Sequence, residues 1–430
     1  MTGLGNTPTD DAPSLGEVTR VWWKIGILSF GGPAAQIALM HKEVVEDRAW
    51  LSEQQYLNAL SFCMLLPGPE AMQLATYAGW RLHGTLGGLI AGLLFVIPGA
   101  VVIMTLAAIY SVYGNVPLVA ALFYGIKAAV LVIVVEALLR IAKKALSRRV
   151  HWVIAGLAFV GIFFLSIPYP LIVLLAGLVG WFLGTAREEQ KVVDMAHVSI
   201  GKTFGTIVGW LAIWLLPLFA LMWLGAPDLL VEVGKFFSTL AIVTFGGAYA
   251  VLAYMAQDVV VQFGWLSAGE MVDALGLAET TPGPLILVTQ FVGFLAGFNE
   301  GGLLLGLAAG LVALWVTFAP CFLWIFAGAP YIEWISNQPR LKGALRAITA
   351  AVVGIILNLS IWFALHVLFS SVTQNKLGPI TLWQPEIASF EWLAGLIFAF
   401  SCFLAFKLHW GIIKVLAVAS FLGAVLRLAV

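Results

Sequence analysis

Several stretches of the chain carry no Asp, Glu, Lys or Arg and are longer than the roughly 20 residues that a helix needs to cross a bilayer. Among them are residues 82–126, 151–186, 203–227, 301–332 and 347–375. The strands of a transmembrane barrel alternate apolar and polar residues, whereas these runs are apolar on every face. Because the chain is also 61% hydrophobic and only 10% charged, we predict an all-α polytopic membrane protein.

Two of these runs contain signals for a turn. The first is interrupted near Gly114-Asn115, and the second at Pro168-Tyr169-Pro170, where two prolines favour a helical hairpin. We expect about 10 to 13 membrane segments, depending on whether the glycine- and proline-rich segments described below cross the membrane or re-enter it. Residues 1–15 are polar and lack the pattern of a cleaved signal peptide, so we expect a short cytoplasmic tail.

The charges and cysteines argue against several other classes of protein. The chain has 22 basic and 22 acidic residues, and this zero net charge argues against a nucleic-acid surface and against a polybasic lipid-binding patch. Cys63, Cys321 and Cys402 are far apart, unlike the close pairs of zinc or redox sites. The sequence suggests no cluster of Asp, Glu and His, so we expect no enzyme activity, no metal and no cofactor. The lipid bilayer is the expected partner.

The chain contains an internal repeat. Phe30-Gly31-Gly32 recurs as Phe245-Gly246-Gly247, at an offset of 215 residues (245 minus 30). The same offset places Pro67-Gly68-Pro69 on Pro282-Gly283-Pro284. Separate motifs in one register indicate two related halves.

Beyond the Pro-Gly-Pro motifs the repeat continues at an offset of 214 (293 minus 79), which pairs Gly79 with Gly293 and Gly92 with Gly306. The repeat therefore covers most of each half. The predicted parts of the chain are the tail 1–15, a first transport repeat 16–186, a linker 187–230 with one membrane crossing, and a second transport repeat 231–430.

Basic residues favour cytoplasmic loops, and they switch sides between equivalent loops of the two halves. The loop at residues 140–149 is basic, whereas its counterpart at 371–391 is poor in basic residues. Two other loop pairs show the reverse, with the basic member in the second half at residues 340–346 and 407–414. The two halves are therefore predicted to be inverted-topology repeats with broken helices.

The breaks in the helices locate the predicted site. Two prolines and a glycine interrupt a helix at each Pro-Gly-Pro motif, and a break within the membrane must be buried in protein or line a cavity. A structural kink is the alternative for these breaks. The paired glycines of the Phe-Gly-Gly motifs can also unwind a helix, with close helix packing as the alternative. Helix N-termini carry partial positive charge, so we predict an anion as cargo. The predicted substrate-binding residues are Phe30, Gly31, Gly32, Pro33, Pro67, Gly68, Pro69, Gln73, Arg81, Lys127, Phe245, Gly246, Gly247, Thr280, Thr281, Pro282, Gly283 and Pro284.

Four of the charged residues near these motifs are candidates for function. Arg81 and Lys127 each adjoin an apolar segment and have an uncharged counterpart in the second half, so we predict that they assist anion binding. Glu70 and Glu279 are acids in otherwise apolar segments, where a carboxylate needs a cavity or a partner. Proton coupling is our hypothesis for both acids. A favourable helix dipole for Glu70 and a structural hydrogen bond for Glu279 are the alternatives.

At these motifs the sequence resembles the chromate ion transporter family, in the long two-domain form. The second half carries a weaker copy, in which Ala248 replaces Pro33 and Leu285 stands where Glu70 stands in the first half. The residues that carry the resemblance are Phe30-Gly31-Gly32-Pro33, residues 43–48 leading into Trp50-Leu51, Leu66-Pro67-Gly68-Pro69, Gln73, Ala75, Gly79, Gly84, Gly87-Gly88, Ala91-Gly92 and Pro98.

The resemblance implies a multi-pass protein of the bacterial inner membrane that exports chromate, driven by an electrochemical gradient, and so confers chromate resistance. Sulfate is the chemically similar anion. A transporter of sulfate or another oxyanion and an anion channel stay open as alternatives, as does assembly into a homodimer.

Overall fold

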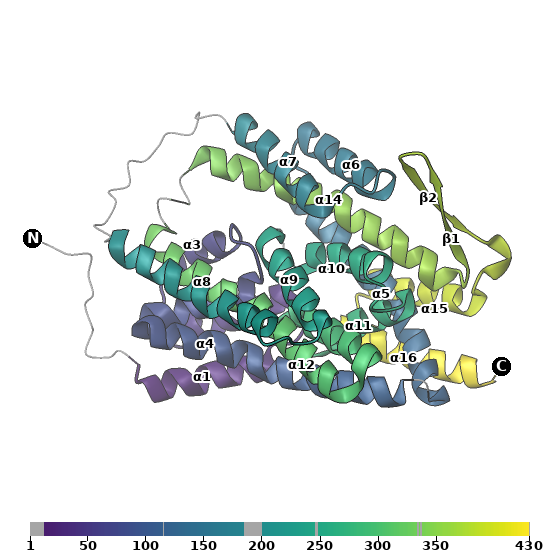
Figure 1. Cartoon of the computed structure of the whole chain (residues 1–430), viewed down its shortest axis with the longest axis horizontal. Helices are drawn as coiled ribbons and strands as arrows, with labels where there is room; N and C mark the ends of the chain where they lie inside the picture. The colour runs from purple at the N-terminus through teal and green to yellow at the C-terminus, as the bar shows by residue number, and fades with distance from the viewer. Residues whose placement is uncertain are drawn as a thin grey trace, which may run out of the picture.

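The structure is a computed structural model, and almost all of what it describes is helical (Figure 1). Within the described part of the chain, six helices are long and apolar enough to cross a membrane, and three shorter apolar helices accompany them. The prediction of an all-α polytopic membrane protein is confirmed. The described residues are 13–114, 116–184, 200–245, 248–332, 335 and 338–429. Most of the predicted tail, the start of the linker, and Gly246 and Gly247 lie outside them.

The first half begins with two short helices and a π-helical turn, continues through a broken segment into two long helices, and ends in a pair of short ones. Both predicted turns are confirmed, because α4 ends and α5 begins around Gly114, and α6 and α7 flank Pro168. The elements are α1 (Leu15–Leu28), α2 (Gly32–His41), η1 (Lys42–Glu46), α3 (Glu53–Cys63), α4 (Glu70–Tyr113), α5 (Pro117–Ala145), α6 (Arg149–Phe163) and α7 (Tyr169–Leu183).

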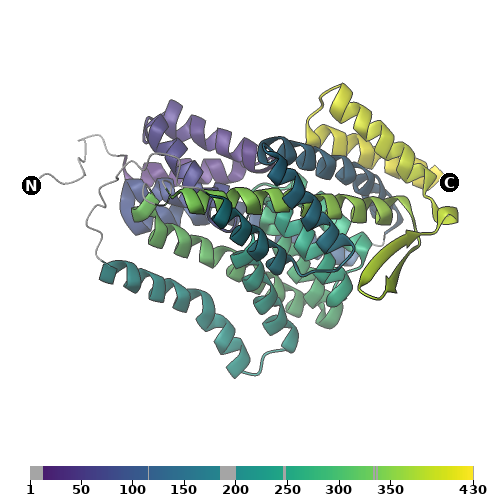
Figure 2. The same ribbon diagram turned by 90° about the horizontal axis from the view of Figure 1, so that it is seen from above.

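The second half follows the same order of elements, with a β-hairpin added before its last two helices. Helix α8 (Ile200–Trp223) precedes it and lies at the edge of the molecule (Figure 2), where Phe204, Phe219 and Trp223 are exposed. The elements are α9 (Asp228–Val243), α10 (Ala248–Gln257), η2 (Asp258–Gln262), α11 (Ala268–Thr280), η3 (Leu285–Leu287), α12 (Val288–Gly328), η4 (Ala329–Tyr331), α14 (Pro339–Leu368), β1 (Val372–Leu377), β2 (Ile380–Pro385), η5 (Ile387–Ser389), α15 (Trp392–Cys402), η6 (Phe403–Lys407) and α16 (Ile412–Ala429).

Helices α4 and α12 are each a helical hairpin. The backbone leaves the helical region at His83 and Gly84 in α4, where Gly84 has a φ of 60°, and α12 repeats this geometry at Gly301 and Gly302. Such positive φ values favour glycine. The short arm of each hairpin precedes the turn and the long arm follows it. In α4 the two arms pack so closely that a Cβ on Gly79 would clash with the backbone of Gly87. Each hairpin thus joins a half-length helix to a full-length one.

The hairpins correct the register of the repeat. The structural offset between the two turns is 218 (301 minus 83), so Gly79 corresponds to Gly297 and not to Gly293. The reason is the additional helical turn η3, which follows the second Pro-Gly-Pro motif and has no counterpart before Glu70. The predicted offset of 214 is therefore about one helical turn short.

The two halves exchange their terminal helix pairs. Helix α14 of the second half packs against α6 and α7 of the first, and α5 of the first half packs against α15 and α16 of the second. Helices α4 and α12 also pack on each other, and each contacts the first helix of its own half, α1 or α9. Glycines permit the close contacts, since Gly180 touches Gly343 on α14 while Gly125 touches Ala419 on α16. The broken segments lie inside this frame.

Candidate functional site

A crossed pair of backbone hydrogen bonds joins each Pro-Gly-Pro motif to the residue that precedes the Phe-Gly-Gly motif of the other half. The N–H of Gly68 in the first half donates to the carbonyl oxygen of Thr244, 3.0 Å away in the second half. The N–H of Gly283 in the second half donates to the carbonyl oxygen of Ser29, 2.8 Å away in the first half. Ser29 and Thr244 directly precede the two Phe-Gly-Gly motifs. Each Pro-Gly-Pro break is therefore bonded to the Phe-Gly-Gly break of the other half.

Glycine is required at the centre of both Pro-Gly-Pro motifs. Gly68 has a φ of +106° and Gly283 a φ of +89°, which a residue with a Cβ rarely adopts. The surroundings are also close: a Cβ on Gly68 would lie 3.1 Å from the sulfur of Cys321, and one on Gly283 would lie 2.9 Å from a methyl group of Leu287. Gly99 of α4 packs directly on the Gly283 backbone. The breaks are thus held by both hairpins.

Buried glutamines surround the breaks. The Nε2 of Gln36 donates to the carbonyl oxygen of Gly283 at 2.7 Å, and the Nε2 of Gln73 donates to that of Pro67 at 2.7 Å. Gln290 lies on the short arm of α12, and all three side chains are at most 2% exposed. Their Oε1 atoms have no hydrogen-bond partner among the described residues. Buried polar atoms normally find partners, so unpaired ones around a break indicate a place for a polar occupant.

The two candidate acids have different surroundings. Glu70 is the first residue of α4 and is half-buried at a helix N-terminus, where a negative charge is favoured. Glu279 is 4% exposed near the end of α11, and the hydroxyl of Tyr249 on α10 donates to its Oε1 at 2.8 Å. Glu279 therefore joins the two helices that flank the second Phe-Gly-Gly and Pro-Gly-Pro breaks.

The predicted cations do not lie together at the breaks. Lys127 forms an ion pair with Asp273, with Nζ 3.2 Å from Oδ2, and Asp273 also accepts a hydrogen bond of 2.7 Å from Tyr110. The positive charge of Lys127 is thus neutralised by an acid of the protein itself. Arg81 is exposed and lies beside the turn of the α4 hairpin, about 16 Å along the helix from Glu70 at 1.5 Å per residue. The structure does not bring Arg81 to the breaks.

Most of the remaining predicted residues do lie at the breaks. Phe30 is 40% exposed, and Gly32 begins α2 with Pro33 as its second residue. The hydroxyls of Thr280 and Thr281 bond back to carbonyls of their own helix. Sequence reasoning missed Ser29, Thr244, Gln36, Tyr249 and Asp273. One available signal was a hydroxyl residue directly before Phe-Gly-Gly in both halves.

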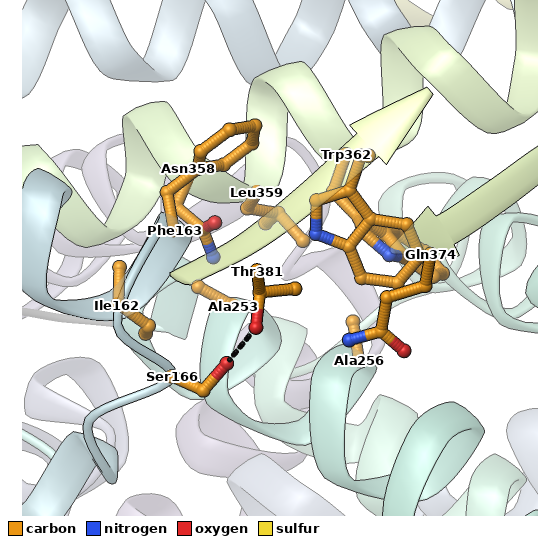
Figure 3. Close-up of a pocket in the computed structure, with 11 residues that line it drawn as sticks. Ile162, Phe163, Ser166, Ala253, Ala256, Asn358, Leu359, Trp362, Gln374 and Thr381 are labelled. Carbon is orange, nitrogen blue, oxygen red and sulfur yellow. Dashed lines mark hydrogen bonds between the residues drawn. The ribbon is translucent and has the colours of Figure 1, made fainter. Parts of the chain in front are cut away.

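The cavities of the structure differ in character. An apolar cavity of about 680 Å³ lies between α8 and the long arms of α4 and α12, and its lining includes Trp210, Trp315 and Phe322. Among the described residues that line it, none is charged. A small polar pocket lies under the β-hairpin, where the hydroxyls of Ser166 and Thr381 are 3.0 Å apart (Figure 3). Its accessible volume of about 10 Å³ holds at most one water.

Loops of like charge meet in the structure. The α6–α7 loop and the β-hairpin, both poor in basic residues, bond to each other through Ser166 and Thr381. At another place the basic side chains Arg148 of the first half and Lys342 of the second line one pocket. In Figure 1 the β-hairpin lies at the right-hand end, whereas α14 begins on the left. This distribution agrees with the loop comparison made from the sequence.

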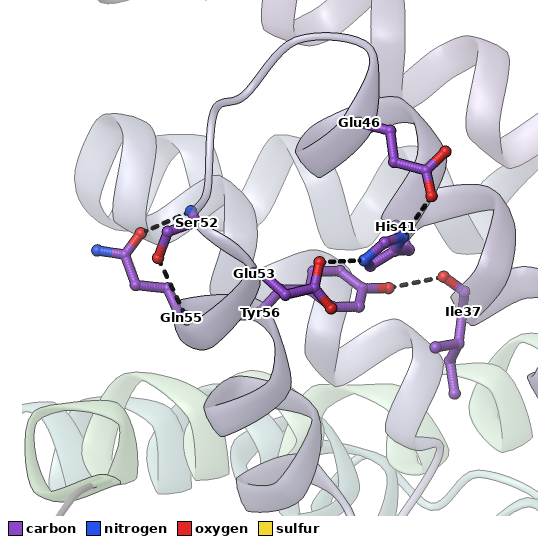
Figure 4. A network of polar contacts seen from close by, with 7 residues as sticks. All are labelled: Ile37, His41, Glu46, Ser52, Glu53, Gln55 and Tyr56. Atoms are coloured by element: carbon purple, nitrogen blue, oxygen red, sulfur yellow. Dashed lines mark hydrogen bonds and ion pairs between the residues drawn. The ribbon is translucent and has the colours of Figure 1, made fainter.

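A charged loop follows the first Phe-Gly-Gly helix. His41 at the end of α2 lies 3.1 Å from Glu46 and 2.7 Å from Glu53, and Tyr56 donates to the carbonyl oxygen of Ile37 (Figure 4). Nearby, the buried carboxylate of Glu43 pairs with Lys24 and Arg48 at 2.6 and 2.7 Å. These ion pairs fix the angle at which α2 leaves the break toward α3.

The fold and the paired breaks define a polytopic membrane transporter. A family model described as chromate transporter matches the chain in two stretches, residues 16–181 and 231–425, and the chain belongs to this family. It is 30% identical over 398 residues to a probable chromate transport protein of Synechococcus elongatus, covering 90% of this chain and 96% of that protein.

Two further relatives cover most of the chain. A chromate transport protein of Pseudomonas aeruginosa is 30% identical over 93% of this chain and 89% of its own length. A chromate transport protein of Cupriavidus metallidurans is 27% identical over 83% of this chain and 84% of its own length. No solved structure matches the chain. The expected location in the bacterial plasma membrane, as a multi-pass protein, follows from the family and the apolar helices.

Proposed function

We propose that this chain is a secondary active transporter that exports chromate, and that the oxyanion binds where the four breaks meet. The crossed hydrogen bonds from Gly68 to Thr244 and from Gly283 to Ser29 carry this proposal. They link a helix break of each half to the other half, and family membership suggests the anion. A tetrahedral dianion is held well by several backbone donors, because these need no buried cation.

The same bonds suggest how the site opens and closes. Each N–H that would serve the anion is bonded here to a carbonyl oxygen of the opposite half. Separation of the halves would release the Gly68 and Gly283 donors, and the amides of Gln36 and Gln73 lie beside them. The oxyanion then replaces the two carbonyl oxygens as acceptor. Return of the carbonyls would displace it.

Inverted repeats give the two halves equivalent roles on opposite sides of the membrane. The elements recur in the same order, the hairpins of α4 and α12 share one geometry, and the terminal helix pairs are exchanged symmetrically. Loops poor in basic residues gather at the β-hairpin, and basic ones gather at the start of α14. By the positive-inside rule the α14 start is cytoplasmic.

The halves differ at the acids, which supports a coupling role there. Glu70 directly follows the first Pro-Gly-Pro motif, and the residue that directly follows the second motif is the apolar Leu285. The counterpart of Glu279 in the first half is Met64 (279 minus 215). Of the two, Glu279 is the better placed, since its bond to Tyr249 links the helices on either side of the breaks. Protonation of this carboxylate would weaken that link during transport.

Chromate flux in everted membrane vesicles tests the proposal. We expect uphill, saturable uptake that collapses when the imposed potential or pH gradient is removed. Excess sulfate should compete, because the two anions share shape and charge. Uptake that only equalises the chromate concentrations on the two sides would indicate a channel. Uptake of sulfate without uptake of chromate would show that sulfate is the transported anion.

A glutamine variant tests the site itself. Gln36→Leu removes the donor to the Gly283 carbonyl and an adjacent buried amide, so we expect the KM for chromate to rise about tenfold or more, on the scale of one lost buried hydrogen bond. Gln54→Leu is the matched control, because Gln54 is exposed and donates to Asn58 on its own helix, away from the breaks. Equal KM values for the two variants would place the anion elsewhere.

A further inference from the structure

A cavity of about 500 Å³ between α6, α7 and α14 is lined by four basic side chains from both halves of the chain. Arg148 precedes α6 and His151 lies in its first turn, whereas Lys342 and Arg346 lie one turn apart on α14. Among the residues that the structure describes, the lining contains no Asp or Glu. The zero net charge of the chain suggested no basic patch, but the fold brings dispersed cations together.

These cations are not neutralised by the part of the protein that the structure describes. None of them forms an ion pair there, although the chain elsewhere pairs Lys24, Arg48 and Lys127 with acids. The Nδ1 of His151 lies 3.4 Å from the Ser147 hydroxyl. Like charges that line one cavity repel one another, so an anion bound there would be stabilised by Arg148, Lys342 and Arg346 together.

Exposed apolar side chains follow the lining residue His151 in sequence or include the lining residue Leu183 and its neighbour, and we call them the apolar rim of the cavity. Trp152 and Val153 on α6 are 62% and 59% exposed, and Phe182 and Leu183 at the end of α7 are 79% and 53% exposed. Nearby, the Arg340 guanidinium lies 6.0 Å from the ring of Trp181. Tryptophan and arginine mark the interface between lipid and water. The cavity therefore lies at headgroup level, with acyl chains beside it.

We propose that this cavity binds the headgroup of an acidic phospholipid in the cytoplasmic leaflet. Basic pockets between membrane helices on this side suit anionic headgroups. The volume also agrees, because about 500 Å³ is the size of a site for a larger molecule, whereas a tetrahedral oxyanion is only a few times larger than a water of about 30 Å³. The phosphodiester lies among the cations, and the acyl chains follow the apolar rim.

A lipid bound there would join the two halves. Its headgroup contacts α6 from the first half and α14 from the second, directly over the close approach of Gly180 to Gly343. The lipid would therefore strengthen the packing of the exchanged helix pair without touching the breaks. This proposal does not depend on the identity of the transported anion.

Native mass spectrometry of the full-length protein in detergent tests the proposal, with phosphatidylglycerol and phosphatidylcholine added at equal concentrations. We expect retention of phosphatidylglycerol only. The double variant Arg148→Gln/Arg346→Gln should bind it about 25-fold more weakly, at about fivefold per cation. The control Lys407→Gln/Lys414→Gln removes two cations outside the cavity, so its binding should equal that of the unmodified chain.

Three results would overturn the proposal. They are equal retention of both lipids, equal phosphatidylglycerol binding by the double variant and the control, and displacement of the lipid by millimolar inorganic phosphate, which would indicate a site for a free oxyanion. If the double variant does not fold, Lys342→Gln is titrated in the same way, with a fivefold weaker affinity expected. An unchanged affinity there would also contradict the assignment.

Discussion

The N–H of Gly283 donates a 2.8 Å hydrogen bond to the carbonyl oxygen of Ser29, and the two residues lie on opposite halves of the chain. Its counterpart joins Gly68 to Thr244 at 3.0 Å. A bond of this kind needs both helices to be interrupted at the same depth, because a continuous helix uses its own N–H and carbonyl groups. The breaks are therefore specific partners of one another.

Replacing either central glycine should impair both stability and transport. Gly283→Ala and Gly68→Ala place a Cβ where φ is positive, which costs about 1–3 kcal/mol. We expect a lower Tm in detergent and chromate uptake reduced at least tenfold in vesicles. The control Gly209→Ala on α8 meets nothing within 4 Å. Normal uptake by both glycine variants would show that the helix breaks are not needed for transport.

A double variant distinguishes two roles for Lys127, which are binding of the transported anion and the ion pair with Asp273. Lys127→Met leaves the buried carboxylate of Asp273 without its cation, which typically destabilises a protein by about 3–5 kcal/mol. Adding Asp273→Asn removes that charge and keeps an acceptor for Tyr110. We expect the double variant to recover thermal stability and chromate uptake. Recovered stability with uptake still lost would show that Lys127 serves the anion directly.

Glu279→Gln should abolish the dependence of chromate uptake on pH, because an amide does not titrate. The size and the acceptor for Tyr249 are retained, so we expect the protein to fold normally. Tyr249→Phe is the companion variant, which removes the hydrogen bond but keeps the carboxylate. It should lower the rate and preserve the pH dependence. Uptake by Glu279→Gln with a normal pH profile would refute the role, and the same measurement on Glu70→Gln decides for Glu70.

The local features of this fold could be predicted from the sequence. Pro168 and Gly114 mark turns correctly, and both Pro-Gly-Pro motifs break helices, since the missing N–H of proline acts on its own segment. The long apolar runs likewise identified the class of protein, because each run is itself the segment that crosses the membrane. Each of these signals lies within a few residues of its structural effect.

The features that depend on distant contacts could not be predicted. Lys127 looked available to an anion, but Asp273 lies 146 residues away in sequence (273 minus 127) and pairs with it. The inserted turn η3 shifted the register of the repeat. The β-hairpin was expected to be loop, although the Gly378-Pro379 pair was a usable turn signal. Burial and pairing are decided by packing, which sequence periodicity does not specify.

The loop after α2 should become more mobile as pH rises. Hydrogen bonding to Glu53, together with the charges of Glu53 and Glu46, raises the pKa of His41 above its ordinary 6.5. The pairing is favourable with His41 protonated, so its contribution is complete below about pH 6.5 and is lost as pH rises through the higher folded value. Hydrogen exchange of residues 41–53, corrected for intrinsic rates, should show this step.

A histidine variant controls for general effects of pH on that loop. His41→Gln should remove the step, and the exposed His409→Gln should leave it unchanged. A step of equal size in the His41 variant would assign it to another group.

Cysteine accessibility should reveal opposite orientations of the equivalent loops α5–α6 and α14–α15. In a background without Cys63, Cys321 and Cys402, Ser147→Cys lies beside the basic cavity and Thr373→Cys on the exposed strand β1. The positive-inside rule places the first in the cytoplasm and the second outside. A membrane-impermeant maleimide should therefore label position 373 in intact cells and position 147 only in everted vesicles. Labelling of both positions from one side would contradict the inverted repeat, because equivalent loops of parallel halves share a side of the membrane.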